Sequence, residues 1–158
     1  MLKIREATPS DAALIFDFIY QLAVYEKMED QVFTSKEELE KNIFQNGYAK
    51  VIIAEENNIP VGFALYFFNF STFDGKPGIY LEDLFVLEEH RGKGYGKKLF
   101  IELAKIAQEK GASKIKWSVL DWNLPSINFY KSLGANPMDE WITYCLKGNE
   151  LDILAKNK

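Results

Sequence analysis

The residues with the clearest chemical capacity lie in the stretch 84–99. There an apolar strand leads into a loop with glycine at alternate positions and then into an amphipathic helix. Without a Cβ, glycine lets the backbone turn its N–H groups toward one point. The following helix adds unpaired N–H groups and the positive end of its dipole. With the full charges of Arg91 and Lys93, this loop predicts a site for phosphate or pyrophosphate.

The loop does not fit either common nucleotide-binding pattern. A dinucleotide fingerprint requires glycine where the chain has Lys97, and a P-loop requires Ser or Thr where it has Lys98. The pattern that fits is Arg-x-x-Gly-x-Gly. Its residues are Arg91, Gly92, Lys93, Gly94, Tyr95 and Gly96. A glycine-rich turn between a strand and a helix, with no ligand, is the alternative interpretation.

A candidate base precedes this loop on the same strand. An alkyl ammonium group has a pKa of about 10.4, so neutralising it near pH 7 costs roughly 4–5 kcal/mol. A carboxylate can attract such a cation and accept its proton, directly or through water. Glu82 has this position. Asp83 points to the opposite face of a regular strand and is the less favoured base unless a bulge intervenes.

Composition limits the classes of protein that the chain can represent. Its 158 residues, with a net charge of −4, predict a single domain over residues 1–158. No apolar run approaches the ~20 residues that span a bilayer, and the start has no signal-peptide pattern. One cysteine and one histidine argue against a disulfide and against a metal site, and predict a cytoplasmic protein. The charge disfavours nucleic acid and suits a cationic small molecule.

The pattern of apolar and turn residues predicts alternating strands and helices. Strands are expected at 2–6, 50–55, 59–68, 79–87, 114–120 and 140–147. Helices are expected in four places: from Pro9, with Thr8 as its cap; from a capping box at Thr34–Glu37 to about Phe44; from the glycine-rich loop to near Gly111; and from Asn123 to about Leu133. The apolar stripe of the first helix is Leu14, Ile15, Phe18, Ile19 and Leu22. This order predicts a mixed α/β (α+β) fold whose mostly antiparallel sheet is flanked by helices.

Several longer segments carry a family resemblance. They are residues 22–26, 28–32, 61–66, 80–86 and 122–130, together with the glycine-rich loop and the order of the elements. Over nearly the whole chain they resemble the GNAT N-acetyltransferases, and among these the spermidine/spermine (diamine) N-acetyltransferase group. The resemblance implies the GNAT acyl-CoA N-acyltransferase fold and acetyl-CoA as co-substrate. Two departures are a hairpin at Glu56–Ile59 that is shorter than in the animal enzymes, and Lys27, where those enzymes tend to place an aromatic residue.

The resemblance also implies which residues form the site. Glu82 matches the glutamate that binds substrate and acts as base, and Tyr130 matches the tyrosine that protonates the leaving thiolate. The residues that match acetyl-CoA contacts are Leu84, Phe85, Val86, Arg91, Gly92, Lys93, Gly94, Tyr95, Gly96, Lys97, Asn123, Ser126 and Tyr130. Those that match the amine site are Tyr25, Glu26, Glu82, Trp117 and Ser118. A backbone N–H near Phe85 or Val86 is expected to face the thioester oxygen.

Each of these residues also has a plain structural interpretation. Tyr130 and Trp117 can be core residues, Asn123 and Ser126 can serve as helix caps, and Glu82 can be a solvated strand residue. His90 is expected to be an exposed loop residue and Cys145 a small apolar strand residue.

We expect acetyl transfer from acetyl-CoA to a polyamine or diamine in a ternary complex, by a homodimer. The alternative acceptors are thialysine, other lysine-like amino acids and basic peptides. A different class, a non-catalytic acyl-CoA-binding module, is disfavoured because both Glu82 and Tyr130 are present.

Overall fold

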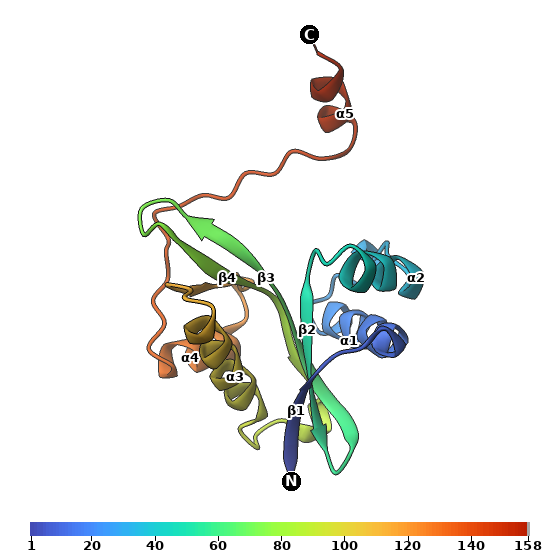
Figure 1. Cartoon of the computed structure of the whole chain (residues 1–158), viewed down its shortest axis with the longest axis vertical. Helices are drawn as coiled ribbons and strands as arrows, with labels where there is room; N and C mark the ends of the chain where they lie inside the picture. Colours follow the sequence, from blue (N-terminus) through green and yellow to red (C-terminus); the bar gives the residue numbers. More distant parts are fainter. Residues whose placement is uncertain (158) are drawn as a thin grey trace. The chain divides into compact units, whose positions relative to one another are not determined.

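The computed structural model describes residues 1–157 and divides into two units, Met1–Ser118 and Val119–Lys158. A five-stranded sheet forms the centre of the first unit (Figure 1). Its strands follow in chain order: β1 (Leu2–Glu6), β2 (Lys50–Glu56), β3 (Ile59–Ser71), β4 (Lys76–Val86) and β5 (Ile115–Lys116). The first four pair antiparallel, and β5 pairs parallel with β4. The mixed, mostly antiparallel sheet predicted from the sequence is confirmed.

Helices lie on both faces of this sheet (Figure 1). Helices α1 (Ala12–Tyr25) and α2 (Lys36–Leu39) lie on one face, and α3 (Tyr95–Glu109) lies on the other. The core between α1 and the sheet contains Ile15, Phe18, Ile43, Val51, Ile53, Phe63, Leu65 and Phe85. The predicted stripe of α1 is confirmed, since its members are either buried in this core or packed against it.

Capping residues fix where the first helices begin. Short 3-10 turns η1 (Pro9–Asp11), η2 (Glu29–Gln31) and η4 (Glu88–His90) occur in the connections. The Asp11 carboxylate accepts a hydrogen bond from the Thr8 N–H at 2.8 Å. It also accepts one from each of the two terminal guanidinium nitrogens of Arg5, at 2.8 and 2.9 Å. The Arg5 contact is the main cause of the lowered pKa of Asp11.

The N-cap of the second helix lies one residue later than predicted. The Ser35 hydroxyl, and not that of Thr34, accepts the N–H of Glu38 at 3.1 Å. The helix then widens into the π-helical segment η3 (Glu40–Gln45).

Two strand predictions near the end of the chain need correction. The strand expected at 114–120 is paired only at Ile115–Lys116. The strand expected at 140–147 is wrong, because no strand of the described residues pairs with it and an unpaired extended segment has no ladder to hold it. Cys145 therefore lies exposed in an irregular segment.

The second unit contains helices α4 (Leu124–Ser132) and α5 (Gly148–Lys156). The Asn123 side chain caps α4 by accepting the N–H of Ser126 at 3.3 Å, as predicted. Within residues 1–157 no helix has both the length and the apolar character needed to cross a membrane.

Candidate functional site

The glycine-rich loop between β4 and α3 has a backbone suited to an anion. Gly92 and Gly94 have φ values of +79° and +81°, in the left-handed region that favours glycine. The first helical hydrogen bond of α3 runs from the Lys98 N–H to Gly94 O, at 3.1 Å. Within the described chain, the N–H groups of residues 92–97 therefore donate no backbone hydrogen bond. A Cβ added at either glycine meets no protein atom within 4 Å. The loop thus offers donors and open space, which fits the pyrophosphate of acetyl-CoA.

Arg91 turns toward the end of β4 and α1. Its Nε donates to the Val86 carbonyl at 2.8 Å. Its guanidinium carbon lies 5.0 Å from the centre of the Tyr25 ring and 5.2 Å from that of Phe85, within cation–π range. Arg91 therefore links residues that the sequence analysis assigned to two different sites, Tyr25 to the amine and Val86 to the coenzyme.

A carboxylate that the sequence analysis did not single out joins the other side of the loop. Glu56, the last residue of β2, accepts hydrogen bonds from the Tyr95 hydroxyl and from Lys93 Nζ, the latter at 3.3 Å. His90 Nδ1 lies 2.9 Å from Glu56 Oε2, close enough for an ion pair but not aligned as a hydrogen bond. The Tyr95 hydroxyl and Lys93 lower the pKa of Glu56. His90 is therefore half-buried and not the exposed loop residue that we expected.

A β-bulge lies in β4 at the predicted base. Leu65 of β3 pairs with Asp83, whereas the next residue, Tyr66, pairs with Leu81, so Glu82 has no opposite residue. Glu82 is exposed and Asp83 is partly buried. Burial is the main cause that raises the pKa of Asp83 to about 7, and the charges of Glu82 and Glu26 contribute to the same rise. The bulge thus makes Asp83 a candidate base that regular alternation had disfavoured.

The end of α1 supplies a third carboxylate to the group formed by Glu82 and Asp83. Glu26 follows the last helical residue, Tyr25, and burial raises its pKa. The turn is a Schellman motif, in which Lys27 N–H donates to Val24 O at 3.0 Å and Met28 N–H donates to Ala23 O at 2.8 Å. Lys27 is the left-handed residue of this motif, with φ of +60°. The turn therefore fixes Glu26 and Lys27 side by side.

One edge of β4 is open beyond the bulge. Strand β5 pairs with β4 only at Ile79 and Tyr80. Within residues 1–157, no other strand pairs with residues 81–86 on the side of β4 that faces away from β3. Leu84, Phe85 and Val86 lie along this stretch. An extended molecule carrying amide groups can pair with such an edge, as an added strand does.

Two predicted amine-site residues follow β5. The Trp117 ring packs edge-on against Phe100 of α3, with centroids 4.9 Å apart. The Ser118 hydroxyl lies 2.9 Å from the Tyr80 hydroxyl, within hydrogen-bond distance. Trp117 thus contacts α3, and Ser118 contacts β4.

The remaining predicted residues belong to the second unit. Asn123 and Ser126 form the cap of α4. Tyr130 lies on the same helix, with its ring centre 5.7 Å from that of Phe129. Their contacts with acetyl-CoA and with the thiolate stay predictions.

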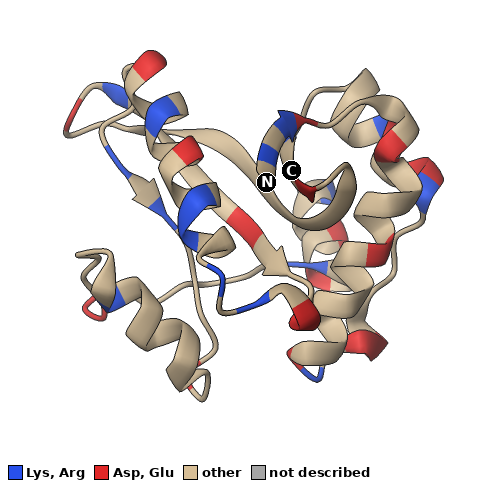
Figure 2. Cartoon of the chain, turned by 90° about the horizontal axis from the view of Figure 1, so that it is seen from below, with Lys and Arg blue, Asp and Glu red and all other residues tan. Residues whose placement is uncertain are grey.

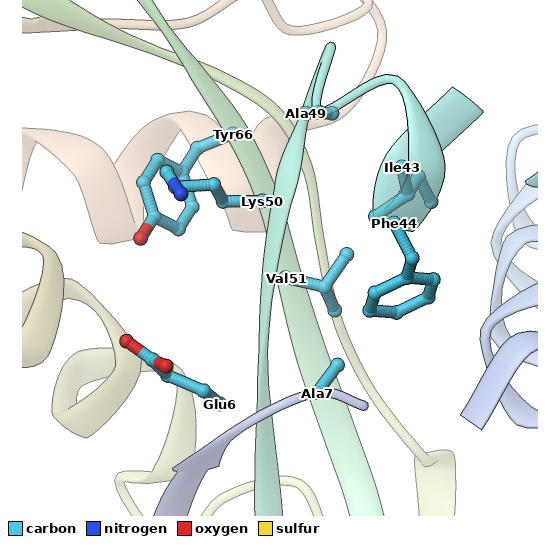
Figure 3. A pocket seen from close by; sticks show the side chains of 9 residues that line it. Glu6, Ala7, Ile43, Phe44, Ala49, Lys50, Val51 and Tyr66 are labelled. Carbon is cyan, nitrogen blue, oxygen red and sulfur yellow. The ribbon is translucent and has the colours of Figure 1, made fainter. Parts of the chain in front are cut away.

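A separate pocket of about 250 Å³ lies where β2 begins. Figure 3 shows Glu6, Lys50 and Tyr66 on one side of β2, and Phe44 and Val51 on the other. Burial, together with the charges of Glu6 and Glu102, raises the pKa of Tyr66. None of the predicted site residues lines this pocket.

Charged residues of both signs are interspersed along the ribbon (Figure 2). Among residues 1–157 no group of three or more His, Cys, Asp or Glu side chains has an arrangement that could hold a metal ion. The expected absence of nucleic-acid and metal partners stays a prediction.

Comparison with known proteins identifies the family of this chain. Residues 16–135 match the Acetyltransferase (GNAT) family. Mouse thialysine N-epsilon-acetyltransferase is 36% identical over 165 residues, which cover 97% of this chain and 96% of the mouse protein. Human spermidine/spermine N(1)-acetyltransferase-like protein 1 is 33% identical over 84% of this chain and 20% of its own length.

A solved structure gives the same result. An integron cassette protein from the V. cholerae mobile metagenome superposes with a TM-score of 0.82 at 31% identity, covering 99% of this chain and 98% of its own. The match spans both the strand that carries the bulge and the loop that follows it. The chain belongs to the Acetyltransferase (GNAT) family.

Proposed function

We propose that this protein transfers the acetyl group of acetyl-CoA to the terminal amine of a small amino acid of the thialysine and lysine type. The observation that carries the proposal is that the charges of Glu26 and Glu82 both act on Asp83, in the strand that runs into the anion-binding loop. Carboxylates there can draw in a cationic amine, and the loop can hold the phosphates of the second substrate.

The reaction requires an amine that has lost its proton. Asp83, with a pKa near 7, is ionised in part of the molecules at neutral pH and still takes up a proton readily, which suits a general base. Glu82 is exposed, so it can receive the amine from solvent and pass its proton to Asp83 or to water. We assign proton removal to this pair of neighbours, because both lie at the bulge in the strand that leads to the loop.

The acetyl group is supplied as a thioester. The amine nitrogen forms a bond to the acetyl carbon while the carbon–sulfur bond breaks, the amine proton goes to the carboxylates, and the thiolate takes a proton from Tyr130. The N–H groups of residues 92–97 hold the phosphates, and a backbone N–H near Phe85 or Val86 faces the carbonyl oxygen. The open edge of β4 accommodates the amide-bearing arm.

Lys27 favours an amino acid over a polyamine as the acceptor. It lies next to Glu26 in a fixed turn, so a positive group lies beside the acids of the amine site. A zwitterionic acceptor can place its amine at the carboxylates and its own carboxylate toward Lys27, whereas a dication is repelled there. The mouse thialysine enzyme, similar over nearly the whole chain, supports this choice.

A polyamine is the second candidate acceptor. The three carboxylates suit a di- or tricationic amine, and the human spermidine/spermine acetyltransferase-like protein is among the relatives.

We also propose a homodimer that acts in the cytoplasm. The exposed Phe70 and Phe73 at the β3–β4 end support the dimer, and sedimentation showing only monomer at tens of micromolar contradicts it.

The substitution Glu82→Gln tests the assignment of the amine site. It keeps the shape but removes a charge and a proton acceptor, so we expect a higher KM for the amine and an alkaline shift of the pH optimum. Calorimetric affinity for acetyl-CoA is expected to stay within about twofold, because the loop is untouched. Glu89→Gln, an exposed acid after the bulge, is the control. Equal amine KM and pH profile in Glu82→Gln and wild type contradict the assignment.

A further inference from the structure

A cluster of side chains around the glycine-rich loop has no role in the mechanism above, which uses only the backbone N–H groups of that loop. It consists of Glu56 from the β2–β3 hairpin and three residues of the loop region, His90, Lys93 and Tyr95. One carboxylate therefore contacts the segment before the loop, its middle and the first residue of α3. Because Glu56 lies 37 positions before Lys93, the cluster ties two distant parts of the chain together.

The hairpin that presents Glu56 is itself well fixed. Asn57 and Asn58 both have positive φ values, +52° and +67°, as in the tight two-residue turn that matches strand twist. The N-terminal ammonium of Met1 donates to Asn57 Oδ1 at 3.2 Å, and Asn57 N–H donates to Met1 O at 3.3 Å. Glu56 is thus held in place from the sheet side.

Few other contacts fix the loop. Arg91 N–H donates to Glu88 O at 3.2 Å, Arg91 Nε donates to Val86 O, and the first α3 bond begins at Lys98. Between these points the loop contains two glycines with positive φ, which are flexible in a free chain. Lys93 and Tyr95, the two residues that alternate with the glycines there, are the ones that Glu56 engages.

We propose that Glu56 is a positioning residue that holds the glycine-rich loop in the conformation that binds the phosphates of acetyl-CoA. This proposal rests on the proposed function, since it assigns the loop to that substrate. A ligand's apparent affinity falls with the fraction of molecules whose site is formed. Anchoring the loop before the ligand arrives therefore tightens binding without any contact to the ligand.

The charge of Glu56 opposes this effect, because an acid near an anion site repels the anion. Lys93 lies 3.3 Å from the carboxylate and offsets its charge. The backbone N–H groups remain to bind the phosphates. Anchoring is therefore expected to outweigh repulsion. If anchoring dominates, removal of the Glu56 side chain weakens acetyl-CoA binding. If repulsion dominates, removal tightens it.

The variants Glu56→Ala, Glu56→Gln and Tyr95→Phe separate these effects. Glu56→Ala is expected to weaken acetyl-CoA binding about tenfold in calorimetry, with kcat and the amine KM within about twofold of wild type. Glu56→Gln keeps an oxygen that accepts the Tyr95 hydroxyl, so it retains affinity within about threefold. Tyr95→Phe shares the loss, and the double variant Glu56→Ala/Tyr95→Phe loses no more than Glu56→Ala alone. Glu89→Ala is the charge-matched control.

A second readout needs no ligand. In the free protein, Glu56→Ala is expected to speed hydrogen exchange at the bonded amides of Arg91 and Lys98, while Glu56→Gln and Glu89→Ala leave it near wild type. Tighter or unchanged acetyl-CoA binding in Glu56→Ala overturns the inference while leaving the proposed function intact. A wild-type protein that binds no acetyl-CoA contradicts the proposed function and this inference together.

Discussion

Asp83 of β4 lies directly opposite Leu65 of β3, a member of the apolar core. Phe85 and Phe63 form the pair two positions further along the same strands. Because side chains alternate between the faces of a sheet, Asp83 lies on the same face as these two rings. Loss of hydration on that face is the first cause of the raised pKa of Asp83. The bulge at Glu82 directly follows the pair of Leu65 and Asp83 along β3 and ends the regular register between the two strands.

Asp83→Asn is predicted to stabilise the protein above neutral pH. The pKa of Asp83 is about 7 in the folded state and 3.8 for an ordinary aspartate, so between these pH values the folded state holds a proton that the unfolded state releases. Stability in the wild type therefore falls as pH rises from about 4 to about 7, by up to about 4 kcal/mol. Asparagine lacks this penalty.

Chemical denaturation at pH 4 and pH 8 measures this effect. We expect Asp83→Asn to match the wild type at pH 4 and to exceed it at pH 8. The same variant is expected to lose the rise in kcat/KM near pH 7. A wild type whose stability is flat across this range contradicts the burial of the Asp83 charge.

Gly94→Val is predicted to lower acetyl-CoA affinity by more than tenfold. The added side chain meets open space and not protein, so it occupies the volume assigned to the phosphates. The φ of +81° adds strain that acts on stability.

Gly111→Val provides a matched control for that strain. Gly111 lies beyond the far end of α3 with φ of +70° and also has no protein atom near an added Cβ. It is expected to lose similar stability but to keep its affinity. If both variants bind acetyl-CoA as the wild type does, the loop is not the phosphate site.

Tyr130→Phe is predicted to lower kcat more than it raises the KM for acetyl-CoA. A general acid contributes about 10²–10⁴-fold in rate, whereas a single hydroxyl's hydrogen bond in the ground state contributes about 1 kcal/mol. Steady-state kinetics with saturating amine measures both constants. Retention of most of the kcat shows that the thiolate takes its proton from water.

Lys27→Asn is predicted to change the choice of acceptor. Asparagine tolerates the left-handed conformation of this turn, so the backbone is kept while the charge is lost. We expect kcat/KM for thialysine to fall about tenfold and that for spermidine to hold or rise, because one ion pair near the surface is lost and one repulsion removed. Lys41→Asn, at an exposed lysine of η3, is the control. An unchanged ratio between the two amines removes Lys27 from the acceptor site.

Much of this arrangement could be predicted from the sequence because it depends on local signals. The glycine-rich loop, the cap at Asn123 and the apolar stripe of α1 each follow from residues a few positions apart. The bulge at Glu82 could not be predicted, because strand register depends on the partner strand.

Contacts between distant segments were equally out of reach. The contact of Glu56 with the loop joins segments more than thirty residues apart. No sequence pattern in either segment predicts this contact. The strand expected at 140–147 failed for the related reason that a strand needs a partner as well as a propensity.

The most direct test of the central claim is the release of free CoA thiol from acetyl-CoA with and without thialysine, combined with mass analysis of the amine. The account predicts amine-dependent release, one acetyl group per amine consumed, and a large loss of rate in the double variant Glu82→Gln/Asp83→Asn, with acetyl-CoA binding kept. Binding of acetyl-CoA without transfer to thialysine, spermidine or a basic peptide contradicts the account and identifies an acyl-CoA-binding module instead.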